Sequence, residues 1–154
     1  MGSVEGLREL TLPQLSPQQA FYLLRESALK SQRILIKARI DYFGDLTERI
    51  ESYFNGERVN FPDRLDLSWA SPFQKRVWET TQSIPYGETR AYAWVAGKVG
   101  ILKAARAVGQ ALARNPLPII IPCHRVICSD GTLGGFSDGK LLKQRLLEME
   151  AKFI

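Results

Sequence analysis

Cys123 and His124 are the two residues of this sequence best suited to chemistry. His124 is the only histidine in 154 residues and directly follows one of only two cysteines. A cysteine is a strong nucleophile as the thiolate, and a neighbouring imidazole is a common means of removing its proton. Adjacent side chains point to opposite sides of an extended segment, or about 100° apart in a helical turn, so direct contact is awkward. The pair therefore predicts a nucleophilic cysteine whose proton reaches the imidazole through a bridging water.

Such a base also needs an acceptor that orients its second ring nitrogen. The candidate carboxylates near the C-terminal end are Asp130, Asp138, Glu148 and Glu150. The alternative interpretation is that Cys123 is a buried, unreactive small residue. The pair by itself does not decide between these interpretations.

Capping and periodicity signals outline the elements that hold this pair. Ser-Pro pairs at 16–17 and 71–72 place an N-cap before a proline at the first helical position, and each predicts a helix. A run of three isoleucines over 119–121 is expected to be buried. The expected elements are a strand over 7–12, helices over 16–30 and 45–54, an extended linker over 59–67, a helix from 71, two helices over about 91–99 and 102–114, and a last helix from about 140.

The helices over 91–99 and 102–114 are separated by a short turn at Gly100, which suggests a helix-turn-helix. The second helix is rich in alanine and glycine, so its backbone can approach another surface closely. It also carries the basic residues Lys103, Arg106 and Arg114. A thin, basic helix suits a DNA groove, and the alternative is close packing against another helix.

The charge distribution favours an anionic partner for the second half of the chain. The net charge is +5, with 45% hydrophobic and 24% charged residues. Residues 1–70 hold nine Lys and Arg against ten Asp and Glu, whereas residues 71–154 hold twelve against six. All of the positive excess therefore lies in the half that contains Cys123, which suggests an anionic partner such as nucleic acid. The alternative is a soluble protein with a high pI, and composition alone does not decide between the two.

Composition also argues against several classes of protein. The sequence has no run of roughly 18 apolar residues that would span a membrane, and no secretory signal at its start. Two cysteines do not make a disulfide framework, and two cysteines with one histidine are too few for a closed zinc site. We therefore expect a cytoplasmic protein, nucleoid-associated in a prokaryote, without metal or cofactor.

Further motifs flank the cysteine. The segment Pro122-Cys123-His124-Arg125 is preceded by Asn115-Pro116 and followed by Gly134-Gly135-Phe136-Ser137. These motifs resemble those of the O6-alkylguanine-DNA alkyltransferases, or methylated-DNA–protein-cysteine methyltransferases. The resemblance runs without gaps from about 71 to 150. It includes Ile84-Pro85-Tyr86-Gly87-Glu88, Ala104-Ala105-Arg106-Ala107-Val108-Gly109 and Leu146-Leu147-Glu148-Met149-Glu150.

The resemblance implies that Cys123 takes an alkyl group from O6 of guanine in DNA, in one irreversible turnover. O4 of thymine is a second candidate substrate atom. His124 resembles the base that acts through water, and Glu150 falls at the position of the glutamate that orients it. Arg125 is expected to support the fold rather than the chemistry, and Cys128 to be a buried small residue.

The resemblance also implies a site for a nucleotide flipped out of the duplex. Tyr92 matches the tyrosine that contacts the target base and its phosphate, and Arg106 matches the arginine that replaces the flipped nucleotide in the stack. Ser137 lies in the loop that closes over the base, and the backbone carbonyls of Cys123 and Val126 would accept from its exocyclic amine. Asn115 resembles the residue that stiffens the turn before the active site. The expected DNA- and base-binding positions are Tyr92, Arg106, Asn115, Val126, Ser137, Ala105 and Lys103.

The expected fold is α/β in two parts. Residues 1–66 would form a small N-terminal part with a reduced β-sheet plus helices, since the chain begins almost at the strand over 7–12. Residues 67–154 would form a mostly helical domain with a winged-helix-like helix-turn-helix for DNA binding and alkyl transfer. The expected partner is double-stranded DNA containing O6-alkylguanine, bound by a monomer away from membranes. Two positions depart from the family pattern: Phe136, where tyrosine is common, and Asp138, where glycine is common.

Two other functions are compatible with parts of this sequence. The first is a DNA-binding damage-recognition module without alkyl transfer, but damage-binding relatives of the family lack the cysteine that this chain has at position 123. The second is a cysteine hydrolase, which would not need a basic, alanine-rich helix with Arg106.

Overall fold

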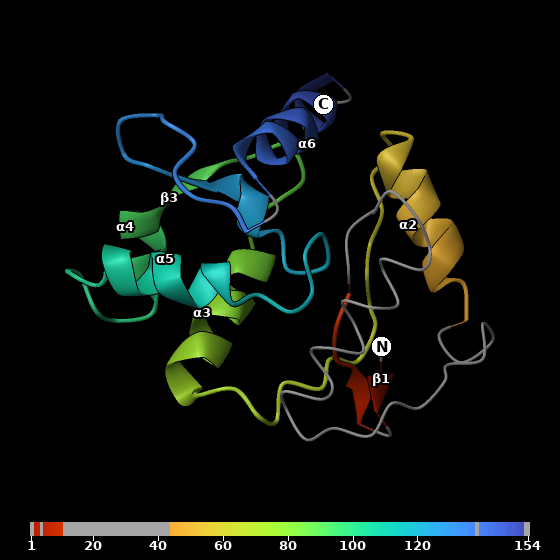
Figure 1. The fold of residues 1–154 in the computed structure, drawn as a ribbon, viewed down its shortest axis with the longest axis horizontal. Helices are drawn as coiled ribbons and strands as arrows, with labels where there is room; N and C mark the ends of the chain where they lie inside the picture. Colours follow the sequence, from red (N-terminus) through yellow and green to blue (C-terminus); the bar gives the residue numbers. More distant parts are fainter. Residues whose placement is uncertain (1, 4, 11–43, 138, 153–154) are drawn as a thin grey trace.

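The computed structural model describes residues 2–3, 5–10, 44–137 and 139–152, and its fold is mixed α/β (Figure 1). The expected helix over 16–30 and Asp138 lie outside the described residues. Helices dominate, and the strands are short. In chain order the elements are β1 (Gly2–Ser3), β2 (Gly6–Leu7), α2 (Leu46–Phe54), α3 (Pro72–Gln82), β3 (Arg90–Ala91), α4 (Tyr92–Lys98), α5 (Ala105–Ala113), the 3₁₀ turn η2 (Cys123–Arg125), β4 (Val126–Ile127) and α6 (Lys140–Lys152).

Helix α3 begins where the sequence predicts. Ser71 is its N-cap and accepts from the backbone N–H of Gln74, whose side chain accepts in return from the Ser71 N–H. This reciprocal pair satisfies two N–H groups that a helix start leaves open. The helix buries Val77 and Trp78, and the Trp78 indole donates to the Ala111 carbonyl of α5 across 3.0 Å. The cap thus sets where α3 begins, and Trp78 attaches this helix to α5.

Helices α4 and α5 form the expected helix-turn-helix. Gly100 takes a left-handed φ of 83°, which ends α4 without the steric cost of a side chain. Helix α5 begins at Ala105, three residues later than predicted from the sequence, because residues 101–104 are needed to reverse the chain. Strand β3, just before α4, pairs in parallel with β4. This small sheet ties the helix-turn-helix to the segment that follows Cys123.

The small residues of α5 lie on both its packed face and its exposed face. Ala111 is buried, and a side-chain carbon at Gly109 would lie 3.7 Å from the Tyr92 ring of α4. Ala107 and Ala113 are exposed instead. One face of α5 therefore packs closely against its neighbours, while a thin, exposed face remains.

The N-terminal strand is shorter than the sequence predicts. Strands β1 and β2 form an antiparallel pair of two residues each, and the prediction of a strand through Arg8–Leu10 is wrong. Beyond Leu7 the backbone bonds to other segments: the Leu10 N–H donates to the Pro116 carbonyl across 2.8 Å. Gly6 is required there, because a side-chain carbon would lie 2.2 Å from the Arg64 carbonyl oxygen.

The helices predicted near 45 and 140 are confirmed: α2 matches the segment over 45–54, and α6 begins at Lys140. The predicted linker over 59–67 contains no helix, and Leu65 within it forms an isolated bridge with Leu7. The three isoleucines over 119–121 are buried. Two apolar clusters hold these elements together. The larger cluster joins Leu7 and Leu46 to the buried faces of α3, α4 and α5. The smaller cluster joins Tyr53 of α2, Ile119 of the isoleucine run and Leu146 of α6.

Candidate active site

Cys123 and His124 belong to a buried 3₁₀ turn, where consecutive side chains point in different directions. Cys123 lies in the wall of a cavity, whereas His124 points toward α6. Neither cysteine of the chain forms a disulfide. The Asn115 amide donates to the Cys123 sulfur across 3.0 Å and to the Ile121 carbonyl across 2.8 Å. The expected divergence of the two adjacent side chains is therefore observed.

His124 is fully buried and pairs with Glu150 of α6. Its Nε2 lies 2.8 Å from Oε1 of Glu150, and its Nδ1 has no hydrogen-bond partner among the residues that the structure describes. An ionised carboxylate only accepts, so Nε2 carries the proton and Nδ1 presents a lone pair. Burial lowers the pKa of His124, although Glu150 acts in the opposite direction. The imidazole is thus neutral and able to take a proton at Nδ1.

Glu150 is the hub of the buried network. Besides His124, its carboxylate accepts from the Arg125 guanidinium at 3.0 Å, the Tyr53 hydroxyl at 2.7 Å and the Gly87 N–H at 3.1 Å. Burial alone would raise the pKa of Glu150, but the hydrogen bonds from His124 and Arg125 outweigh it and hold this pKa well below its ordinary value. The carboxylate stays ionised, which keeps the imidazole in one tautomer.

The structure distinguishes among the carboxylates considered from the sequence. Glu150 contacts His124, whereas Asp130 is exposed and accepts from Thr132, and Glu148 is exposed and accepts from Gln144. Arg125 also donates to the Ile84 carbonyl across 2.7 Å, so it connects η2 to the end of α3. This contact is consistent with a structural role for Arg125.

Cys123 lines a cavity of about 480 Å³ between α5 and the loop over 134–137. Its lining is mostly apolar. Several residues singled out from the sequence line it: Tyr92, Ala105, Arg106, Cys123, Cys128, Phe136 and Ser137. Other sequence candidates do not line it. Lys103 is exposed at the turn before α5. The remaining candidates are buried or partly buried and do not contribute to the cavity lining: Asn115, Val126, His124 and Glu150.

The buried cation Lys143 was missed by the sequence reasoning. Its ammonium donates to the Val126 carbonyl across 2.6 Å and lies 5.7 Å from the centre of the Tyr92 ring. Burial lowers the pKa of Lys143, against the attraction of Cys123 and Cys128. The available signal was its position three residues before Leu146 and seven before Glu150, which puts all three on one helix face. The Val126 carbonyl, expected to accept from a base, already has one donor.

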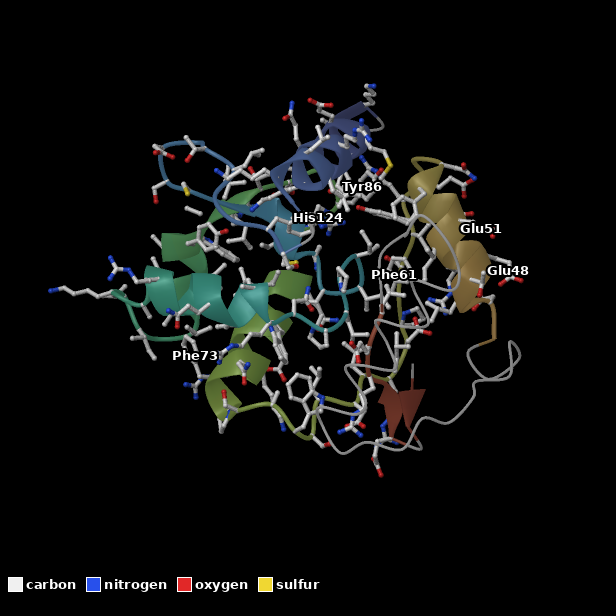
Figure 2. All side chains as sticks on the ribbon, viewed as in Figure 1. Glu48, Glu51, Phe61, Phe73, Tyr86 and His124 are labelled. Carbon is white, nitrogen blue, oxygen red and sulfur yellow. The ribbon has the colours of Figure 1, made fainter. Side chains whose placement is uncertain are left out.

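Tyr53 of α2 is the second residue that sequence reasoning missed. It appeared there only as part of an apolar helix face. A buried tyrosine hydroxyl needs a partner, which was the available signal. Figure 2 shows His124 and Tyr86 near α6, with Glu48 and Glu51 on the outer side of α2. Tyr53 belongs to the inner side, and its ring centre lies 6.5 Å from that of His124.

Residues 72–152 match the sequence model of the DNA-binding domain of 6-O-methylguanine DNA methyltransferase. The chain belongs to this methyltransferase family. The matched residues include α3 to α6 and the Cys123–His124–Glu150 set.

Individual relatives agree with this assignment. The methylated-DNA–protein-cysteine methyltransferase of Mycolicibacterium paratuberculosis is 47% identical over 110 residues, which are 71% of this chain and 66% of the relative. The chain thus spans just under two thirds of that relative's length. The crystal structure of Mycobacterium tuberculosis O6-methylguanine methyltransferase matches with a TM-score of 0.67 and 45% identity, over 73% of this chain and 67% of the other. Mycobacterium tuberculosis OGT in complex with DNA matches with a TM-score of 0.68 and 40% identity, over 76% and 75%.

Among the described residues, no group of three or more His, Cys, Asp and Glu side chains is arranged to hold a metal ion. None of the helices in the described ranges combines the length and apolar character that crossing a membrane requires.

Proposed function

We propose that the chain repairs alkylated DNA by moving an alkyl group from O6 of guanine to the sulfur of Cys123, once per molecule. The observation that carries this proposal is the position of Cys123. Cys123 lines a mostly apolar cavity that Arg106 of α5 also borders, and the next residue belongs to the buried His124–Glu150 pair. The nucleophile would thus share its cavity with a helix suited to DNA, while the base would act from the adjacent buried pair.

The reaction would proceed as a displacement at the alkyl carbon. The thiol proton passes through a water to Nδ1 of His124, and the Asn115 amide stabilises the resulting thiolate. The sulfur then forms a bond to the alkyl carbon as the bond from this carbon to O6 breaks. The electron pair of the broken bond goes to guanine, which takes up a proton. The thioether product is stable, so each molecule acts once.

The substrate nucleotide would have to leave the duplex to reach this cavity. Extrusion costs a few kcal/mol of stacking and pairing, and a damaged base costs least. Arg106 is exposed at the cavity rim and would occupy the vacated space, while Tyr92 inside the cavity would contact the base. The exposed Ala107 and Ala113 would let α5 enter a minor groove about 6 Å wide.

Other expected roles are part of the same proposal. Lys103 and Ala105 would contact the DNA at the start of α5, and the Ser137 backbone would donate to O6. The Val126 carbonyl would use its second lone pair for the base, since Lys143 occupies the first. We also propose that residues 1–66 and 67–154 are the two domains, that the protein acts as a cytoplasmic monomer, and that O4-alkylthymine is a second substrate.

The proposal is tested with a duplex that contains one O6-methylguanine. After incubation, peptide mass spectrometry should find one added methyl group on the Cys123 peptide and none in Cys123→Ala. DNA binding without any mass change would overturn alkyl transfer and leave a damage-recognition module. Turnover of thioester or peptide substrates would favour a hydrolase instead.

A further inference from the structure

Tyr53 brings α2 into direct contact with the His124–Glu150 pair. Its side chain is buried, with 1% of its surface exposed. Its hydroxyl lies 2.7 Å from Oε1 of Glu150 and 3.2 Å from Nε2 of His124. Tyr53 lies outside the matched range 72–152, so this contact joins the nucleophile's base to a segment that precedes the matched domain.

The direction of these hydrogen bonds follows from the groups. Burial and the Glu150 carboxylate raise the pKa of Tyr53 above its ordinary value, so the phenol keeps its proton. It donates this proton to Oε1 of Glu150, the same oxygen that accepts from Nε2–H of His124. Tyr53, His124 and Arg125 therefore all donate to Oε1 of Glu150, and the hydrogen bond from the phenol reduces the negative charge that this oxygen presents to the imidazole.

The position of Tyr53 is well defined by packing. Its ring makes edge contacts with Phe61 and Tyr86, at centroid distances of 6.4 and 6.1 Å. Helix α2 is itself anchored to the linker, because Arg49 forms two hydrogen bonds of 2.7 and 2.8 Å with Asp63. The hydroxyl is thus held in place by the fold and does not reach the site from a loose side chain.

We propose that Tyr53 is a positioning residue that tunes the proton affinity of His124 through their shared carboxylate oxygen and so makes the reactivity of Cys123 depend on docked α2. The importance of this role for repair rests on the proposed function, whereas its main test measures His124 and Cys123 without DNA. Tyr53 touches neither the thiol nor the cavity among the described contacts, so it acts through His124.

The inference predicts a direction for pH dependence. The charged and titratable groups that face the His124–Glu150 pair are Tyr53 from α2, Tyr86, Arg125 from η2 and Lys143 from α6, with Cys123 next to it in the chain. Without the Tyr53 hydroxyl, Oε1 becomes a better acceptor for the protonated imidazole. The imidazole then stays protonated up to a higher pH. The neutral imidazole, which is the form that can act as a base, is therefore absent over a wider range of acidic pH.

The test compares Tyr53→Phe with Tyr86→Phe. Both variants remove one hydroxyl from the same aromatic cluster, but the Tyr86 hydroxyl donates to the Gly56 carbonyl and touches neither His124 nor Glu150 in the described contacts. Because the chain has one histidine, ¹⁵N-histidine labelling reports the protonation of His124 directly. The rate of Cys123 alkylation by iodoacetamide is followed against pH in parallel, in a Cys128→Ser background.

In Tyr53→Phe, the midpoint of His124 protonation and the acid limb of the Cys123 rate should both move to higher pH by about half a unit or more, and the rate near this limb should fall roughly three- to tenfold. Tyr86→Phe should leave both midpoints in place. A Tyr53→Phe profile that overlays the wild type, or an equal shift in Tyr86→Phe, overturns the inference.

Should Tyr53→Phe fail to fold, 3-fluorotyrosine at position 53 alone provides the second variant. Its more acidic phenol is a stronger donor, so both midpoints should move to lower pH, and unchanged or higher midpoints overturn the inference. Neither readout requires DNA. A wild type that fails to repair O6-methylguanine but shows these shifts would refute the proposed function and retain the role of Tyr53.

Discussion

The Asn115 side-chain amide donates to the sulfur of Cys123 across 3.0 Å, while its carbonyl oxygen accepts from the Leu117 N–H across 3.0 Å. One side chain therefore shapes the turn after α5 and holds a donor against the Cys123 sulfur, the proposed nucleophile. An amide donor stabilises a thiolate more than a thiol, so this contact favours the reactive form of Cys123.

Replacing Asn115 by aspartate should separate these two tasks. Asn115→Asp keeps the acceptor for the Leu117 N–H but puts a carboxylate beside the sulfur. In a Cys128→Ser background, we expect Cys123 alkylation by iodoacetamide at pH 7 to slow by about tenfold or more, since a hydrogen bond to a charged group contributes roughly 1.5–3 kcal/mol. The rate should recover partly at higher pH, where the thiol ionises. An unchanged rate would show that the amide does not stabilise the thiolate.

Removing the charge of Glu150 should destabilise the fold at neutral pH. Glu150→Gln leaves the buried Arg125 without its carboxylate partner, and breaking a buried pair costs about 3–5 kcal/mol. Because the pKa of Glu150 is lowered on folding, its stabilisation is present above the unfolded value of 4.5 and is lost as the pH falls through the folded value. The measurement is the free energy of unfolding in urea at pH 7 and near pH 3. The difference between wild type and variant should shrink at the lower pH; a difference independent of pH would contradict this linkage.

Arg106→Ala should impair repair in DNA more than the chemistry itself. The Arg106 side chain borders the cavity on the exposed face of α5. Its loss removes the group that would fill the space left in the base stack by the flipped nucleotide. We expect single-turnover repair of O6-methylguanine in a duplex to slow by about tenfold or more, since a vacated stack costs a few kcal/mol. Reaction with the modified base alone should change little.

Arg114→Ala is the matched control for charge. Arg114 is exposed just after α5 and does not line the cavity. Its loss should weaken DNA binding modestly and reduce the salt dependence. Equal loss of duplex and free-base reaction in Arg106→Ala, or equal effects of the two arginine variants, would refute the proposal that Arg106 takes the place of the flipped nucleotide.

Gly134→Ala should be costly because two constraints meet at this residue. Gly134 has a φ of 68°, and a side-chain carbon there would lie 3.0 Å from the Tyr92 hydroxyl and 3.2 Å from the Cys128 sulfur. Gly131 has a φ of 84° but nothing within 4 Å, so Gly131→Ala measures backbone strain alone. Each should lower the free energy of unfolding by about 1 kcal/mol from strain, with a larger loss for Gly134→Ala from crowding. Urea unfolding checks the order, and an equal loss in both would show that the pocket relaxes.

Signals carried by neighbouring residues were interpreted correctly from the sequence. The Ser71–Pro72 start of α3 and the Gly100 end of α4 depend on capping and on φ preference within a few residues. The helix over 45–54 and the burial of 119–121 follow from spacing and hydrophobicity alone. The strand predicted over 7–12 does not continue through Arg8–Leu10, because the partners of Leu7 and Leu10 are at Arg64 and Pro116, far along the chain.

The site shows the same division. The sequence by itself singled out Cys123 and His124 as the candidate reactive pair and, through the family motifs, Glu150 as a partner, because these residue types and spacings carry chemical meaning; the structure places Glu150 against His124. Only the tertiary structure brought Tyr53 to His124 and Glu150, which lie 71 and 97 positions away, and placed the Lys143 ammonium on the Val126 carbonyl. Such contacts depend on how helices pack and on which buried polar groups find partners, and that is decided by the whole chain together.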